Sequence, residues 1–297
     1  MAGAWLASVG GCRALRCEQA QDEALASARQ LSLHAMELQE HGRWEQSEAL
    51  FAAAVQQCPA DERARCGYAQ ALWQRGARDQ AVSHMEEAVR LSGHDPERLV
   101  QLGEMYLFRG ELQRAGQQAD RAIAANSQLA AAWALRAQVE QAEGRREEAL
   151  AKFHRALSLR EQYPEVQLAI ADIYAQDGRP QRALGTLQAL AANYPPAQVP
   201  ADVLIREGFA LRDLGRFQDA AIALAQAAER GNASAELYYE LARVQLRAGD
   251  TSAARQSALA ALQRDPSHTA SQALARDLAP REGIIAAATP ESPSRLY

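Results

Sequence analysis

The stretch LGEMYLFRGELQRA, residues 102–115, decides the fold, because a glycine interrupts what is otherwise good helix-forming sequence. Glycine costs about 1 kcal/mol relative to alanine inside a helix. The same interruption recurs along the chain at Gly42, Gly76, Gly110, Gly144, Gly178, Gly215 and Gly249. Successive glycines are separated by 34, 34, 34, 34, 37 and 34 residues. A fixed period of this kind indicates a stacked array, in which each glycine reverses the chain from one helix into the next.

Small residues keep phase with these glycines. Seven positions before each glycine stand Ala35, Ala69, Gly103, Ala137, Ala171, Gly208 and Ala242. Five positions after each glycine stand Ser47, Ala81, Ala115, Ala149, Ala183, Ala220 and Ala254. Two helices can approach closely only where their side chains are small. The two columns therefore predict the crossing point within each helical hairpin.

Prolines mark the ends of the second helices, at Pro59, Pro195 and Pro266. The single spacing of 37 arises from three extra residues in NYPPAQVPAD, residues 193–202, where prolines forbid helix continuation. Two interpretations stay open. The segment is either a longer loop, or a change of superhelix pitch that separates five repeats from two.

This pattern resembles the tetratricopeptide repeat (TPR) family. The family motif is visible as Leu99-x2-Leu102-Gly103-x2-Tyr106, and again as Trp133 followed by Ala149-x3-Phe153 and Ala156. Departures are local: Glu140 and Gln245 replace an expected aromatic residue, and Arg65 and Gln167 replace an expected tryptophan. The resemblance implies an all-α fold, a right-handed α-α superhelix of about seven helix-turn-helix repeats with a C-terminal capping helix.

The array is expected to span residues 28–278. Its repeats are placed near 28–61, 62–95, 96–129, 130–163, 164–197, 201–234 and 235–268, and the capping helix near 268–278. Residues 1–27 form an N-terminal segment that includes the start of the first helix. Residues 279–297 have no period and are expected to be a disordered tail.

Composition narrows the function. The net charge of −5 argues against a general nucleic-acid binder, and no segment holds 18 or more apolar residues. The chain has no P-loop and no GxGxxG, and its histidines occupy unrelated repeat phases. We therefore expect no enzyme, no cofactor and no metal site. Cys58 and Cys66 could pair in an oxidising compartment, although free thiols are favoured.

The N-terminus carries a second motif. Val9-Gly10-Gly11-Cys12 resembles a bacterial lipobox, whose cysteine is acylated, although the preceding apolar stretch is short and lacks Lys or Arg. Lipidation of Cys12 would anchor the protein to the envelope, whereas an accidental match would leave a cytoplasmic adaptor. Palmitate labelling separates the two, because label that survives Cys12→Ser refutes the anchor.

The TPR resemblance implies a non-catalytic scaffold that binds a partner polypeptide on the concave face, which the first helix of each repeat lines. Helical spacing from the turn glycines assigns candidate partner-binding residues to this face: Met36, Trp73, Phe108, Phe209, Arg212, Tyr239, Arg243 and Arg247. Arg206, which is adjacent to one of the selected positions, is a further candidate. The arginines favour a partner with acidic groups or a C-terminal carboxylate. The competing interpretation is that Trp73 and Phe108 pack on a neighbouring helix and that the arginines are solvated or paired with Asp213 and Glu240. The lysines and asparagines of the family's chaperone-tail clamp are missing from this face.

Overall fold

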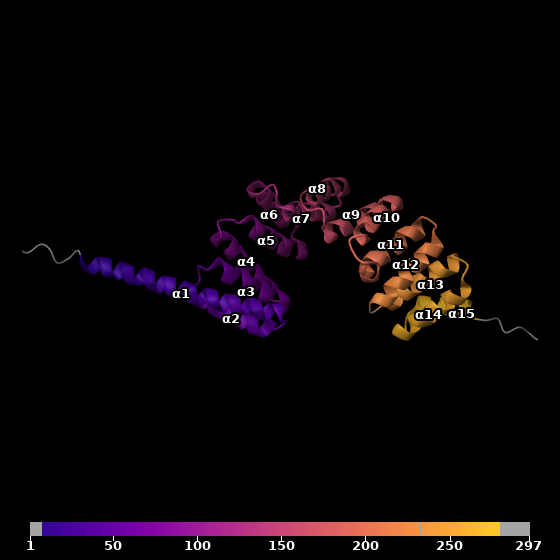
Figure 1. Ribbon diagram of the computed structural model, residues 1–297, viewed down its shortest axis with the longest axis horizontal. Helices are drawn as coiled ribbons and strands as arrows, with labels where there is room; N and C mark the ends of the chain where they lie inside the picture. The colour runs from indigo at the N-terminus through magenta and orange to yellow at the C-terminus, as the bar shows by residue number, and fades with distance from the viewer. Residues whose placement is uncertain (1–7, 232, 280–297) are drawn as a thin grey trace, which may run out of the picture. The chain divides into compact units, whose positions relative to one another are not determined.

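The computed structural model describes residues 8–231 and 233–279, with side chains described from residue 23 onward. The described chain is all helical, with fifteen α-helices and one 3₁₀ turn and no strand (Figure 1). The α-helices are α1 (Ser8–Glu40), α2 (Trp44–Gln57), α3 (Glu62–Arg75), α4 (Arg78–Leu91), α5 (Pro96–Phe108), α6 (Leu112–Ala125), α7 (Ala130–Ala142), α8 (Arg146–Leu159), α9 (Pro164–Gln176), α10 (Pro180–Ala191), α11 (Ala201–Asp213), α12 (Phe217–Arg230), α13 (Ala235–Arg247), α14 (Thr251–Arg264) and α15 (Thr269–Asp277).

The described part of the chain forms two compact units, which meet in the sequence between residues 166 and 167, near the start of α9. In each unit, successive helices pack as neighbouring pairs, and buried aliphatic and alanine side chains form the core between them. The predicted all-α array of helical hairpins is thus confirmed.

The predicted turn conformation is also confirmed. All seven phased glycines have φ between +66° and +89°, the left-handed region that glycine adopts without steric cost. At the end of α5, the Gly110 N–H donates to Leu107 O at 2.9 Å, and the Glu111 N–H donates to Tyr106 O at 2.9 Å. These two bonds satisfy carbonyls at the end of the helix, as a glycine C-terminal cap does.

The small-residue columns lie where the helices of a hairpin cross. Every residue of both columns is buried. A Cβ atom added at Gly103 would lie 3.4 Å from Ala115 O, and one added at Gly208 would lie 3.4 Å from Ala220 O. The two columns therefore face each other across the hairpin, as the sequence predicts.

The longer spacing forms a short 3₁₀ turn, Pro196–Gln198, between α10 and α11. Arg230 holds this loop, because its guanidinium donates to Val199 O at 2.8 Å and to Pro196 O at 2.6 Å. Val199 is buried in a core cluster that extends from Ala171 to Val244. The loop thus packs within the second unit without interrupting its core. A change of superhelix pitch at this loop stays a prediction.

Glu140, which replaces an expected aromatic residue, is buried among basic side chains. Its Oε1 atom lies 2.7 Å from Lys152 Nζ, 3.4 Å from Arg136 Nη1 and 3.6 Å from Arg145 Nη1. A buried carboxylate is tolerated only when opposite charges compensate it. At this position, three basic side chains therefore compensate the buried carboxylate that stands where the motif has an aromatic ring.

The ends of the chain and the cysteines complete the fold. The capping helix α15 falls inside the range 268–278 predicted for it. The side chain of Cys12 and the predicted tail, apart from Ala279, lie outside what the structure describes. Cys58 and Cys66 are both free thiols. No helix in the described part of the chain has the length and apolar character needed to cross a membrane.

Candidate partner-binding site

Four of the predicted partner-binding residues converge on one cavity in the second unit. The cavity has a volume of about 440 Å³. Helices α11, α13 and α15 supply all of its lining except Phe217, the first residue of α12. The lining residues are Arg212, Phe217, Tyr239, Arg243, Val244, Leu246, Arg247 and Leu274. Arg212, Tyr239, Arg243 and Arg247 are therefore brought together, as their repeat phase indicates.

Two of the three arginines are fixed by a shared carboxylate. Arg212 Nη1 lies 3.1 Å from Glu240 Oε2, and Arg243 Nη1 lies 2.6 Å from Glu240 Oε1. Arg212 also contacts Asp213, with Nε 2.9 Å from Oδ1. The hydrogen bond to Glu240 raises the pKa of Arg243 above its ordinary value. These are the pairs that the competing interpretation names, and they orient the guanidinium groups.

Aromatic rings position the same guanidinium groups. The Arg212 Cζ atom lies 4.9 Å from the centre of the Phe209 ring, and the Arg243 Cζ atom lies 5.7 Å from that of Tyr239. Arg247 Cζ lies 4.9 Å from the centre of the Phe217 ring. Within the described part of the chain, Arg247 has no ion pair.

The electrostatic character of the cavity follows from its lining. Three arginines line it together with aromatic and aliphatic side chains. Asp213 and Glu240, which pair with Arg212 and Arg243, are not among the lining residues, and Arg247 has no ion pair in the described part of the chain. Guanidinium groups bind carboxylates through paired hydrogen bonds, and cation–π contacts hold them in place. The arrangement can bind an anionic group and an apolar side chain side by side.

Arg206 and Phe209 do not line this cavity. Arg206 Nε lies 2.7 Å from Asp172 Oδ1, and its Nη1 atom is also bonded to Asp202. These two carboxylates satisfy the guanidinium, so Arg206 ties α11 to α9. Phe209 acts through the ring contact that supports Arg212.

In the first unit, the aromatic candidates contact each other. The ring centres of Trp73 and Phe108 lie 5.4 Å apart at an interplanar angle of 79°. The Arg78 Cζ atom lies 4.6 Å from the Trp73 ring centre and 4.0 Å from that of Phe108. The pair thus packs between helices, as the competing interpretation proposes, although Phe108 remains 66% exposed.

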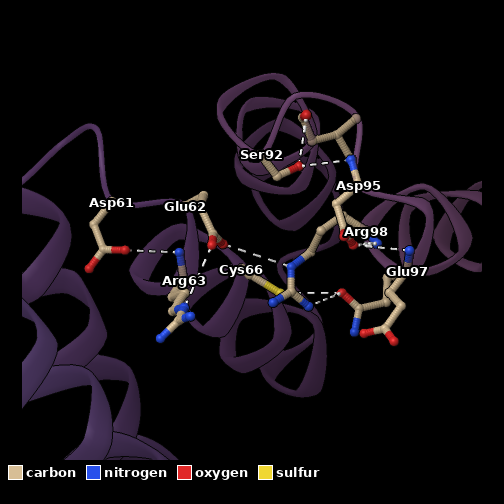
Figure 2. Close-up of polar contacts among 10 residues, drawn as sticks. Asp61, Glu62, Arg63, Cys66, Ser92, Asp95, Glu97 and Arg98 are labelled. Atoms are coloured by element: carbon tan, nitrogen blue, oxygen red, sulfur yellow. Dashed lines mark hydrogen bonds and ion pairs between the residues drawn. The ribbon is translucent and has the colours of Figure 1, made fainter.

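Met36 lies apart from this pair, on a cavity of about 610 Å³ in the first unit. Cys66 and Arg98, which line this cavity, both make polar contacts (Figure 2). The Cys66 thiol donates to Gln101 Oε1 at 3.3 Å, and Arg98 Nη1 donates to the same oxygen at 3.1 Å. Burial raises the pKa of the Cys66 thiol, so this cysteine stays protonated and is a poor nucleophile.

Sequence reasoning missed several lining residues. Leu274 belongs to the capping helix, and its place beside Arg247 depends on how α15 packs. Leu33 and Asp61 line the first-unit cavity, but neither falls on the helical positions used to select the concave face. A wider selection that included the positions adjacent to Ser32, ten residues before Gly42, would have found Leu33.

Paired helices joined by left-handed glycine turns, with small residues at every crossing, define the class of α-helical repeat solenoids. Within this class the chain belongs to the tetratricopeptide repeat family. Family models described as "Tetratricopeptide repeat" match residues 32–96, 141–200 and 205–269, which is more than half of the chain.

Solved structures show the same fold. A tetratricopeptide repeat protein from Parabacteroides merdae is 16% identical, with a TM-score of 0.59, and the match covers 85% of this chain and 99% of that one. PilW, described as a type IV pilus biogenesis factor, is 20% identical with a TM-score of 0.64, over 71% of this chain and 96% of PilW. YrrB, described as a TPR protein with an unusual peptide-binding site, is 18% identical with a TM-score of 0.54, over 65% and 97%. No curated protein matches the sequence.

Proposed function

We propose that this protein is a non-catalytic scaffold that binds a partner polypeptide, with a carboxylate of the partner in the arginine-lined cavity of the second unit. The observation that carries this proposal is the cavity lining, which presents three guanidinium groups and no acidic side chain. A C-terminal carboxylate fits best, because it brings one negative charge next to an apolar last side chain. Phe217, Leu246 and Leu274 offer the apolar surface for that side chain.

The proposed cellular role is that of an assembly factor or adaptor protein at a bacterial envelope. PilW is described as a pilus biogenesis factor and YrrB as a peptide-binding protein, and the proposal extends roles of this kind to the present chain. Lipidation at Cys12 would supply the anchor. A cytosolic regulatory adaptor is the alternative. Fractionation of tagged protein, with and without Cys12→Ser, distinguishes the two locations.

Arg247→Glu is the sharpest test of the cavity. Arg247 has no ion pair with the described residues, so its reversal removes a cation without leaving a carboxylate unpaired. The matched control is Arg255→Glu on α14, outside the cavity. A partner is first captured by crosslinking and identified by mass spectrometry. Its C-terminal peptide is then synthesised with a free carboxylate and with a C-terminal amide.

We expect the free carboxylate to bind about tenfold more tightly than the amide, the effect of a charge-assisted hydrogen bond. Arg247→Glu should abolish this preference and Arg255→Glu should retain it. Arg212→Glu with Arg243→Glu should abolish capture of the partner. Unchanged capture by that double variant, or equal binding of the two peptides, would refute the assignment of the cavity.

A further inference from the structure

The cavity of about 610 Å³ in the first unit has a different chemistry from the arginine cavity. One wall comes from α1, through Ser32, Leu33, Met36 and Gln39, and the opposite wall comes from the start and middle of α3. Leu33 is 66% exposed and Met36 is 53% exposed, so the rim presents apolar surface to water. Phe51 lies at the base, beside Gly67.

Two polar atoms of this lining are buried without a hydrogen-bond partner. They are Oδ2 of Asp61 and Nε2 of Gln39. The Asp61 side chain is 5% exposed, and its other oxygen accepts the Arg63 N–H at 3.0 Å as the cap of α3 (Figure 2). Leaving a buried polar atom unpaired costs about 1–3 kcal/mol, so such atoms are rare in folded proteins. The helix cap accounts for one oxygen of Asp61 and leaves the other without a structural role.

The two unpaired atoms have complementary character. The carboxylate oxygen of Asp61 accepts a hydrogen bond, and the amide nitrogen of Gln39 donates one. A peptide main chain offers the matching set, an N–H donor and a C=O acceptor in each residue. The apolar rim matches an aliphatic side chain on the same segment.

Charge argues for a neutral occupant. Arg29, Arg63 and Arg98 line the cavity together with Glu40 and Asp61, so both signs of charge face its interior. Glu62 partly compensates two of the arginines, because its carboxylate lies 3.7 Å from Arg63 Nε and 3.9 Å from Arg98 Nε. An ammonium group entering here would meet the three guanidinium groups, and a carboxylate would meet Glu40 and the unpaired oxygen of Asp61. A segment without charge avoids both penalties.

We propose that this cavity binds a short, uncharged, apolar stretch of a partner's main chain. A peptide N–H donates to Asp61 Oδ2, a peptide C=O accepts from Gln39 Nε2, and an aliphatic side chain packs on Leu33 and Met36. The inference rests on the proposed scaffold function and deepens it by adding a second subsite, in the other unit, that recognises a different chemistry from the carboxylate cavity.

The test uses the full chain with methyl-13C-labelled methionine. The chain holds four methionines, Met1, Met36, Met85 and Met105, so the spectrum is simple and Met36→Leu assigns the signal at the cavity. Met85 and Met105 are buried and serve as internal references. The probe is N-acetyl-leucine N-methylamide, which carries one main-chain donor and acceptor pair at each end of an aliphatic residue. The comparison probes replace leucine by glycine or by lysine.

We expect a saturable shift of the Met36 signal with the leucine probe, and a much weaker response to the glycine and lysine probes. Asp61→Asn should weaken binding about tenfold, because asparagine keeps the helix cap but replaces the acceptor by a donor. The same variant should unfold at about the same temperature, because aspartate and asparagine are similar N-cap residues. A structural role for Asp61 would instead lower the unfolding temperature.

A matched pair of surface variants distinguishes binding at the cavity from nonspecific binding to exposed apolar side chains. Leu33 and Phe108 are both 66% exposed apolar residues in the first unit, and only Leu33 lines the cavity. Leu33→Ser should therefore weaken binding of the leucine probe, and Phe108→Ser should leave that binding unchanged. No saturable shift at Met36, equal responses to leucine and glycine, tighter binding of lysine, or full binding by Asp61→Asn would each overturn the inference. Partner capture that depends on Arg247 would survive any of these results, so failure of this subsite is distinguishable from failure of the scaffold proposal.

Discussion

Gly67, in the middle of α3, leaves no room for a larger residue beside the Phe51 ring. A Cβ atom added there would lie 2.2 Å from Phe51 Cε1 and 2.3 Å from Phe51 Cζ. Phe51 is 1% exposed, so its ring is enclosed by the core. Gly116, in the middle of α6, is the matched position with space available, because a Cβ atom there would lie 3.6 Å from Val139 Cγ1, an ordinary contact.

Replacing each glycine by alanine therefore has opposite effects. Both substitutions gain about 1 kcal/mol from helix propensity. At Gly67 the methyl group also overpacks the core against a rigid ring, which costs about 3 kcal/mol, the upper part of the usual range. We expect Gly67→Ala to lower the free energy of unfolding by about 2 kcal/mol. We expect Gly116→Ala to raise it by about 1 kcal/mol.

Urea unfolding followed by tryptophan fluorescence measures both effects. All four tryptophans, at positions 5, 44, 73 and 133, fall within residues 1–166, so their emission reports the first unit. The double variant Gly67→Ala with Phe51→Leu should be more stable than the sum of the two single changes predicts, because the smaller side chain relieves the overlap. If Gly67→Ala stabilises the unit as Gly116→Ala does, or if the two changes are simply additive, the packing argument is wrong.

Two further predictions concern charged groups. Asp250 caps the N-terminus of α14, and hydrogen bonds from the Ala253 N–H and the Ser252 hydroxyl lower the pKa of its carboxyl group. Its contribution to stability is therefore fully present above the ordinary pKa of aspartate. That contribution is lost as the pH falls through the lowered pKa of the folded state. Asp250→Asn should therefore flatten the acid limb of a thermal-unfolding series in which the wild type declines, and an unchanged limb would contradict this origin. Glu140→Gln should lower the free energy of unfolding by about 3 kcal/mol, because Lys152 and Arg136 lose their buried counter-charge. Fluorescence-monitored urea unfolding checks it, and a variant as stable as wild type would show that those cations rehydrate at no cost.

Part of the candidate site was predictable from the repeat period, as the fold was. Arg212, Tyr239, Arg243 and Arg247 were selected by counting back from turn glycines, and they meet because a regular helix repeats its faces and consecutive hairpins stack in register. The count fails where a side chain has a stronger local partner. Arg206, which is adjacent to a counted position, does not line the cavity, because Asp172 and Asp202 bind its guanidinium. Trp73 and Phe108 likewise contact each other and Arg78.

The sequence by itself determined the repeat period, the left-handed turns and the crossing points. Each depends on an intrinsic property of one residue, the freedom of glycine at positive φ or the small size of alanine, acting between neighbours in the chain. The tertiary structure alone decided which side chains share a partner. Arg212 and Glu240 are 28 residues apart in the sequence. Oδ2 of Asp61 is unpaired because no hydrogen-bond donor of the described chain lies within reach of it. Such relations depend on distances between packed helices, which a residue pattern along one helix does not contain.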